Sequence, residues 1–177
     1  MTTKGLVLTE TPSVLRRGWN IQCIATLFVL ALCVACGPIG PFSGGHLSGD
    51  EAGWPADWNS AADVTEIQLE TGLEDPHSVN LWIVVVDDEA YIATSLLIGS
   101  EVPEEREWVR NVDADPRVRV RVDGIIYPAR LETVVKDPAL KVRILEAYQS
   151  KYPEMDELRG NAARFYKIVK PTAAAKT

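Results

Sequence analysis

Cysteine is scarce in this chain, and beyond residue 36 it is absent. The three cysteines, Cys23, Cys33 and Cys36, all lie in an apolar N-terminal segment. The rest of the chain therefore has no disulfide, no cysteine-ligated zinc and no cysteine nucleophile. Histidine is almost as scarce, because His46 and His77 are the two that the sequence holds and they do not form a ligand pair. We expect no metal site.

Positive charge and catalytic motifs are also lacking. The 177 residues include 18 lysines and arginines against 25 aspartates and glutamates, a formal net charge of -7. Because nucleic-acid binding requires clustered positive charge, we expect no nucleic-acid partner. The sequence has no Gly-x-Ser-x-Gly, no glycine-rich phosphate loop and no paired-carboxylate motif. If the protein is an enzyme, a cofactor must carry its chemistry.

The N-terminus has the pattern of an export signal. Residues 1–20 are polar and include Arg16 and Arg17, and residues 21–35 are apolar apart from two positions. This run is shorter than the ~20 residues of a membrane-spanning helix. Its end, Leu-Cys-Val-Ala-Cys-Gly, resembles a bacterial lipobox. The pattern predicts cleavage just before Cys36 and lipid modification of that residue.

An uncleaved anchor and a simple secretory signal are the alternatives. In every one of these cases the body of the protein is extracytoplasmic, either tethered to a membrane or secreted. We therefore interpret residues 1–36 as a signal peptide with a lipobox-like end. We expect a membrane-anchored lipoprotein of the cell envelope.

Residues 37–59 have the composition of a linker, rich in glycine, proline and serine and without apolar periodicity. We interpret them as a tether that holds a domain at residues 60–170 clear of the headgroups. Trp54 and Trp58 are too apolar for a solvated linker, so we expect them to pack on the domain; contact with the membrane interface or a ligand is the alternative. Residues 171–177 are expected to be a disordered tail.

The domain is expected to be mainly β with helices (α+β), a six-stranded antiparallel barrel flanked by two or three helices. Its clearest strand is 117–122, where arginine and valine alternate, followed by the hairpin turn Asp123-Gly124. Asp115-Pro116 ends a helix that directs Trp108 inward. The expected strands are 64–71, 79–86, 90–97, 117–122, 125–135 and 163–169, and the expected helices are 103–114 and 138–152.

Several short motifs of this domain occur in an order known from one superfamily. They are LWIVVV at 81–86, YIATS at 91–95, EWVRN at 107–111, DPRV at 115–118, Gly124 with Tyr127 and Ala129, and AYQSKYP at 147–153. In this order they resemble the split β-barrel superfamily of pyridoxamine 5'-phosphate oxidase-like proteins, and within it the deazaflavin-dependent nitroreductase and quinone-reductase branches. The resemblance covers about residues 64–169.

The resemblance implies a homodimer whose interface holds a flavin such as FMN or a deazaflavin. It also implies cofactor-binding contacts from Thr94, Ser95, Trp108, Arg110 and Asn111. From spacing alone, we interpret Trp108 as a core position rather than a stacking platform, and the alternative for Asn111 is a cap at the end of its helix.

The loop at 72–78 differs from the cationic loop that deazaflavin-binding relatives usually carry, because it holds two carboxylates that repel phosphate. An anionic cofactor would then depend on other cations, Arg110 and the arginine strand among them, with Arg119 and Arg121 as binding residues. The guanidinium fork suits phosphate and carboxylate groups. The alternative for this strand is a solvated face, or pairing with the protein's own carboxylates.

These observations lead to two hypotheses for function. The first is a membrane-anchored split-barrel protein that binds a flavin or deazaflavin and passes hydride from the reduced cofactor to a small acceptor. The second is a cofactor-free barrel that serves as a binding or envelope-structure module.

Overall fold

The structure is a computed structural model, and it describes residues 37–40, 42–94, 106–153 and 163–172. The expected signal peptide with Cys36, the predicted site residue Ser95 and positions 173–177 of the expected tail lie outside these ranges. Within them, no helix combines the length and the apolar character needed to cross a membrane.

Six antiparallel strands close into a barrel, in the order β6-β5-β2-β3-β4-β7 with β7 pairing back onto β6. A short strand β1 adds to β6 in parallel. The described residues also form two α-helices and one 3-10 turn, so the expected fold class, an α+β split barrel of six antiparallel strands, is confirmed. The bounds are β1 Asp50–Glu51, η1 Asn59–Ala61, β2 Glu66–Thr71, β3 His77–Val86, β4 Glu89–Ala93, α2 Glu107–Ala114, β5 Arg117–Val122, β6 Ile125–Thr133, α3 Pro138–Lys151 and β7 Phe165–Val169.

The barrel interior is filled by every second residue of its strands. Val118 and Val120 of β5 and Ile67 and Leu69 of β2 are all at most 2 % exposed and belong to one core cluster. Successive strand residues point to opposite faces, so the arginines of β5 and the polar residues of β2 are directed outward. The turn at Asp123-Gly124 has φ values of 48° and 83°, as the predicted two-residue hairpin requires.

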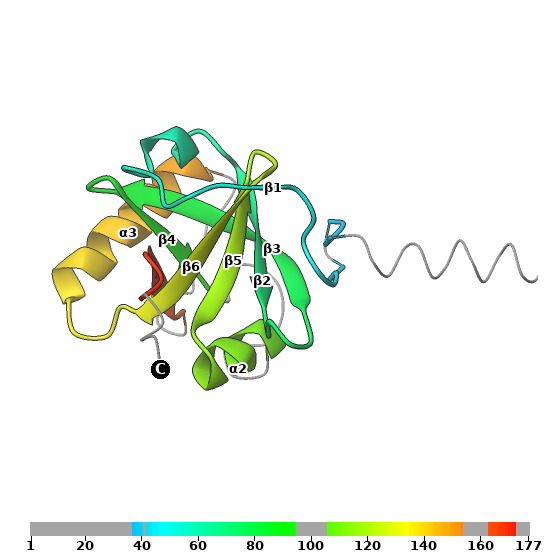
Figure 1. Ribbon diagram of the computed structural model, residues 1–177. Coiled ribbons are helices and arrows are strands. Elements are labelled where there is room, and N and C mark those ends of the chain that lie inside the picture. Colours follow the sequence, from blue (N-terminus) through cyan, green and yellow to red (C-terminus); the bar gives the residue numbers. More distant parts are fainter. Residues whose placement is uncertain (1–36, 41, 95–105, 154–162, 173–177) are drawn as a thin grey trace, which may run out of the picture. The chain divides into compact units, whose positions relative to one another are not determined.

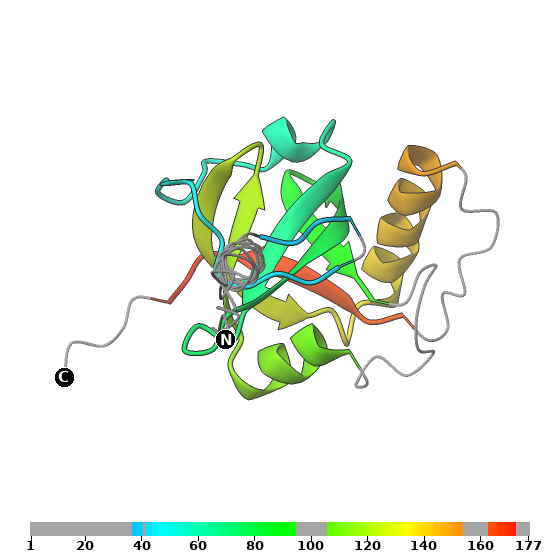
Figure 2. The same ribbon diagram turned by 90° about the vertical axis from the view of Figure 1, so that its right-hand side faces the viewer.

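Helix α2 packs at one end of the barrel, whereas α3 lies along its outer wall (Figures 1 and 2). The inward side of α2 is the predicted one, because Trp108, Val109 and Val112 are buried. Trp108 meets Tyr166 of β7 edge to face at 5.5 Å. It is therefore a core residue in this structure.

Helix α3 begins as predicted, because the Asp137 side chain accepts a hydrogen bond from the Leu140 N–H at 2.8 Å. Tyr148 of this helix and Tyr152, which directly follows it, form hydrogen bonds with the main chain of β3 and of Thr65. The Tyr148 hydroxyl donates to the Trp82 carbonyl at 3.0 Å. The Tyr152 hydroxyl lies 2.7 Å from the Thr65 carbonyl oxygen and accepts from the backbone N–H of β3 at 3.1 Å.

The residues expected to form a tether are joined to the barrel at several points of the part that the structure describes. Trp58 is 4 % exposed, and Trp54 contacts it edge to face at 5.5 Å, so the expected packing of both tryptophans on the domain is confirmed. Earlier in the segment, Leu47 is fully buried and β1 pairs with β6. We call residues 37–40 and 42–52 the covering segment. Whether it also acts as a spacer from a membrane stays a prediction.

We expect Tyr152→Phe to lower the free energy of unfolding by about 1–3 kcal/mol, because the buried backbone N–H of Ile83 loses the hydroxyl that accepts its hydrogen bond. Urea denaturation of the full chain measures this change. Tyr127→Phe is the matched control, since Tyr127 packs edge to face on Trp58 through its ring. Equal stability losses in the two variants would contradict the role given to the Tyr152 hydroxyl.

Candidate functional site

The outer face of β5, β2 and β3 carries two parallel rows of polar side chains. In the first row Glu70 of β2 stands opposite Arg119 of β5 on one side and Ser78 of β3 on the other. In the second row Gln68 stands opposite Arg121 and Asn80. Directly opposed residues in adjacent strands point to the same face, so each set of three forms a continuous row. The covering segment lies over both rows.

The first row centres on a buried carboxylate. Glu70 is 1 % exposed, and its Oε2 accepts from Arg119 Nη1 at 2.9 Å. The same oxygen accepts from the Leu47 backbone N–H at 2.5 Å, and its Oε1 lies 3.2 Å from Nδ1 of His46. Because Leu47 and His46 belong to the covering segment, Glu70 joins that segment to the barrel.

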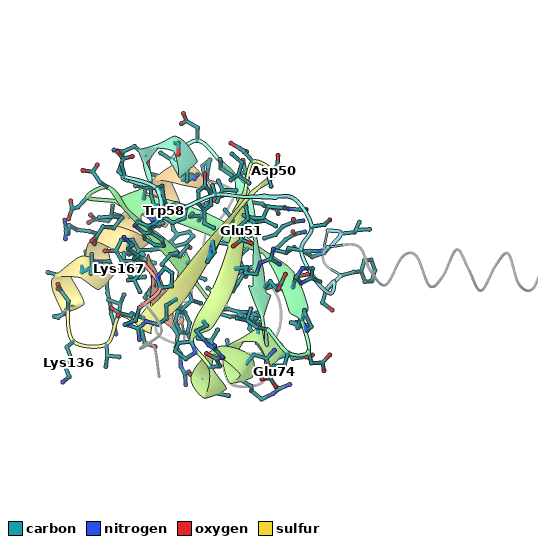
Figure 3. All side chains as sticks on the ribbon, viewed as in Figure 1. Asp50, Glu51, Trp58, Glu74, Lys136 and Lys167 are labelled. Atoms are coloured by element: carbon teal, nitrogen blue, oxygen red, sulfur yellow. The ribbon has the colours of Figure 1, made fainter. Side chains whose placement is uncertain are left out.

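The Arg119 guanidinium contacts several oxygen atoms of the same chain. Besides Glu70, it donates to the Leu47 carbonyl at 3.0 Å, and its Nη2 lies 3.7 Å from Glu51 of β1. Figure 3 shows Glu51 in front of β5 and β6. The Arg119 side chain is only 17 % exposed. A guanidinium in contact with a buried carboxylate keeps little positive potential. The first row is therefore a poor binding site for an anion.

The second row contains three hydrogen-bond donors, each directed at a backbone carbonyl of the covering segment. Arg121 Nη1 donates to the Ser48 carbonyl at 2.7 Å. Gln68 Nε2 donates to the Pro38 carbonyl at 3.2 Å, and Asn80 Nδ2 donates to the Gly40 carbonyl at 2.9 Å. No carboxylate forms an ion pair with Arg121 in the described part of the chain. The charge of Arg121 in the second row is therefore not neutralised by a described carboxylate, whereas the charge of Arg119 in the first row is neutralised by Glu70.

Two oxygen atoms in these rows are buried without a hydrogen-bond partner among the described residues. They are Oε1 of Gln68 and Oγ of Ser78. Buried polar atoms in native proteins nearly always have a partner, so each unsatisfied one requires an explanation. Both atoms lie beneath the covering segment, where a hydroxyl or N–H of a ligand would satisfy them.

The remaining arginines of the stripe are paired with the protein's own carboxylates, which is the alternative stated above. On the surface, Nη2 of Arg117 lies 2.5 Å from Oδ2 of Asp115. The hydrogen bond from Arg117 lowers the pKa of Asp115. Arg130 pairs with Glu132. Among the four arginines of this hairpin, Arg121 alone has a backbone carbonyl rather than a carboxylate as its described partner.

The residues singled out by the superfamily resemblance lie apart from these rows. Thr94 is buried, and its hydroxyl accepts from the Arg164 N–H at 2.9 Å while its own N–H donates to the Arg164 carbonyl at 2.9 Å. Asn111 Nδ2 donates to the Thr71 hydroxyl at 3.1 Å, which ties α2 to β2. Arg110 is on the exposed side of α2. A cofactor-binding role for these residues stays a prediction.

Four residues of the two rows were missed by the sequence reasoning: Glu70, Ser78, Gln68 and Asn80. The alternation in residues 64–71 already directed Gln68 and Glu70 to the face opposite Ile67 and Leu69. That signal could have placed them beside the arginines, had the pairing of β2 with β5 been known. The part played by His46 and the covering segment has no counterpart in the local pattern.

Comparison with known families gives one match. The family described as "Uncharacterized protein conserved in bacteria (DUF2255)" matches residues 58–176, well over half of the chain. None of the curated proteins matches the sequence.

Solved structures of similar fold share little sequence with this chain. A conserved hypothetical protein from Mycobacterium tuberculosis is 20% identical, with a TM-score of 0.48 over 64% of this chain and 78% of the other. An FAD-binding protein from Mesorhizobium loti is 18% identical, with a TM-score of 0.42 over 63% and 82%. An F420-H2 dependent reductase is 17% identical, with a TM-score of 0.43 over 59% and 94%. These likenesses are too distant to assign a cofactor or a reaction to this chain.

We expect Arg119→Ala to lower the free energy of unfolding by about 3–5 kcal/mol, because Glu70 would remain buried without its cation. Thermal or urea denaturation of the full chain measures the loss. Arg117→Ala, which breaks an exposed pair in the same strand, should change stability very little. If Arg119→Ala proved as mild as Arg117→Ala, Glu70 would not depend on Arg119.

Proposed function

The chain belongs to the DUF2255 family of bacterial proteins, and from that premise we propose that it binds a flavin-type nucleotide, FMN or a deazaflavin, on the outer face of β5, β2 and β3. The observation that carries the proposal is the second row. Arg121, Gln68 and Asn80 direct three donors at three carbonyl oxygens of the protein's own covering segment. A ligand rich in phosphate, carboxylate or hydroxyl oxygens offers the same kind of acceptor.

The chemistry of this row suits the anionic part of such a ligand. Arg121 supplies a planar guanidinium, the group best matched to phosphate and carboxylate oxygens. The amides of Gln68 and Asn80 add neutral donors on one line with it. The buried Oε1 of Gln68 and Oγ of Ser78 would accept from ligand hydroxyl or N–H groups. When bound, a flavin or deazaflavin would supply hydride transfer to a small acceptor, which side chains alone cannot perform.

The first row sets a limit on where the negative charge of the ligand can lie. Glu70 is a buried carboxylate, and an anion beside it would be repelled. We therefore place the anionic group of the ligand at the Arg121 end of the second row. The covering segment has to move for the ligand to bind, since its carbonyls occupy the donors.

One observation favours the second hypothesis, a cofactor-free binding or envelope-structure module. Arg117, Arg119 and Arg130 are all paired with carboxylates of the same chain. A protein whose cations serve mainly its own structure needs no anionic cofactor. The two hypotheses differ in one measurable property, which is whether any flavin-type nucleotide binds.

We also propose that the protein acts at the cell envelope, held by lipid on Cys36, and that it forms a homodimer. Support for the anchor comes from the lipobox-like sequence at 32–37. Support for the dimer comes from the superfamily resemblance.

Cofactor binding is tested by titrating the detergent-purified full chain with FMN and with F420 in turn, following absorbance and melting temperature. Binding should raise the melting temperature, because a ligand that binds the folded state stabilises it. We expect Arg121→Ala to weaken binding by about tenfold or more, since a hydrogen bond to a charged group contributes about 1.5–3 kcal/mol.

The matched control is Arg143→Ala, which removes an exposed arginine paired with Asp87 on another side of the barrel. It should bind like the unmodified protein. Binding of neither nucleotide would overturn the proposal in favour of the cofactor-free module. Equal weakening by the two substitutions would move the site away from the second row.

Lipid anchoring is tested separately with Cys36→Ser in the full chain expressed in a bacterial host. We expect this variant to keep its precursor mass and to lose the incorporation of labelled fatty acid. Cys33→Ser is the control, and it should still be processed and labelled. Labelled fatty acid in Cys36→Ser would show that Cys36 is not the modified residue.

A further inference from the structure

The covering segment carries the two most exposed large apolar side chains of the described residues. Ile39 is 69 % exposed and Phe42 is 74 % exposed, whereas Leu47, a few residues later, is fully buried. A single exposed apolar residue is ordinary on a protein surface. Two that are held together on one projecting turn require an explanation, which the rest of the fold does not supply.

A tight turn brings these two side chains together. The Ile39 N–H donates to the Phe42 carbonyl at 3.1 Å, and the Phe42 N–H donates to the Ile39 carbonyl at the same distance. Two residues that exchange both hydrogen bonds stand directly opposite, with their side chains on one face. Gly40 has φ +56°, a conformation that suits glycine within such a turn.

The turn is fastened to the barrel on both sides. The carbonyls of Pro38 and Gly40 accept from side chains of β2 and β3. Beyond the turn, Gly44 and Ser78 exchange backbone hydrogen bonds at 2.8 Å in both directions. The barrel therefore presents Ile39 and Phe42 in a fixed direction, and they do not pack into its core.

The sequence places this turn beside the expected membrane anchor. Ile39 is three residues after Cys36, and a chain of three residues spans at most about 11 Å. The apolar run at 21–35 ends just before Cys36, so the same distance limit applies whether the signal is cleaved or retained. Residues 37–49 contain no lysine, arginine, aspartate or glutamate. Nothing charged in this stretch opposes contact with lipid.

We propose that the Ile39–Phe42 turn inserts into the interfacial layer of the membrane that holds the N-terminus, and that it fixes the orientation of the barrel on that membrane. The proposal rests on the proposed anchoring and concerns the protein without bound nucleotide, in which Gln68 and Asn80 hold the turn. Two side chains bury too little apolar surface to hold a protein on lipid alone, and stable attachment takes two signals. The turn is thus a second contact, which acts once the N-terminus is anchored.

A fluorescent label next to the turn tests the proposal. Ser43 is exposed and adjoins Phe42, so Ser43→Cys in the full chain accepts a thiol-reactive fluorophore while both apolar residues stay in place. The labelled protein, without added nucleotide, is reconstituted into vesicles of phosphatidylcholine and phosphatidylglycerol that contain acyl-chain quencher lipids. The matched control carries its label at Val142→Cys, an exposed position on α3.

We expect strong quenching of the label at position 43 and weak quenching at position 142. Adding Ile39→Ser and Phe42→Ser to the Ser43→Cys protein should reduce quenching to the level of the control. Equal quenching at positions 43 and 142, or quenching that the two serine substitutions leave unchanged, would overturn the proposal. Self-quenching that rises with the protein-to-lipid ratio would assign the turn to a second copy of the chain, and would also overturn it.

The parent protein without an introduced cysteine separates this result from a failure of the anchor. A lipid-modified Cys36 has no free thiol, so the cleaved parent should take up no label. If the parent takes up label, Cys23→Ser, Cys33→Ser and Cys36→Ser are added to both labelled proteins, and quenching that persists at position 43 shows that the anchoring residue is wrong while the inserted turn stands.

Discussion

The ion pair between Glu70 and Arg119 is the interaction on which the arrangement of this molecule's outer face depends. Glu70 is almost fully buried on the outer side of a barrel strand, a place where a carboxylate is costly unless it is paired and hydrogen-bonded. Arg119 supplies the charge, and the Leu47 N–H supplies the hydrogen bond. Because Leu47 belongs to the covering segment, satisfying this one carboxylate also fastens residues 46–51 to the barrel wall.

That fastening divides the polar face into two parts of different strength. In the first row a charged pair is shielded from water, and breaking it is costly. In the second row three hydrogen bonds to backbone carbonyls hold residues 38–48, and each such bond contributes only about 0.5–1.5 kcal/mol net, or somewhat more from the charged Arg121. A ligand that offered better acceptors could replace them. The covering segment is therefore held more strongly at Glu70 than at Arg121, and the Ile39–Phe42 turn belongs to the more weakly held part.

Local chemistry was enough to predict most of the fold. The arginine–valine alternation identified β5, Asp123-Gly124 identified the hairpin, and Asp137-Pro138 marked the start of α3, because each depends on backbone geometry within a few residues. The two polar rows were predictable only in part. Arg119 and Arg121 were recognised, but their partners come from β2, β3 and a segment ~70 residues earlier that has no periodicity. Pairing over that distance depends on strand order, which no local pattern contains.

We propose above all that the second row is a ligand site covered by the protein's own chain. Amide hydrogen exchange of the full chain, with and without saturating flavin-type nucleotide, tests it most directly. Residues 37–44 are held by Gln68, Asn80 and the Gly44–Ser78 hydrogen bonds, so displacement by ligand should speed their exchange while the core strands become more protected. Nucleotide binding that leaves exchange in residues 37–44 unchanged, or slows it, would place the ligand elsewhere and contradict the account.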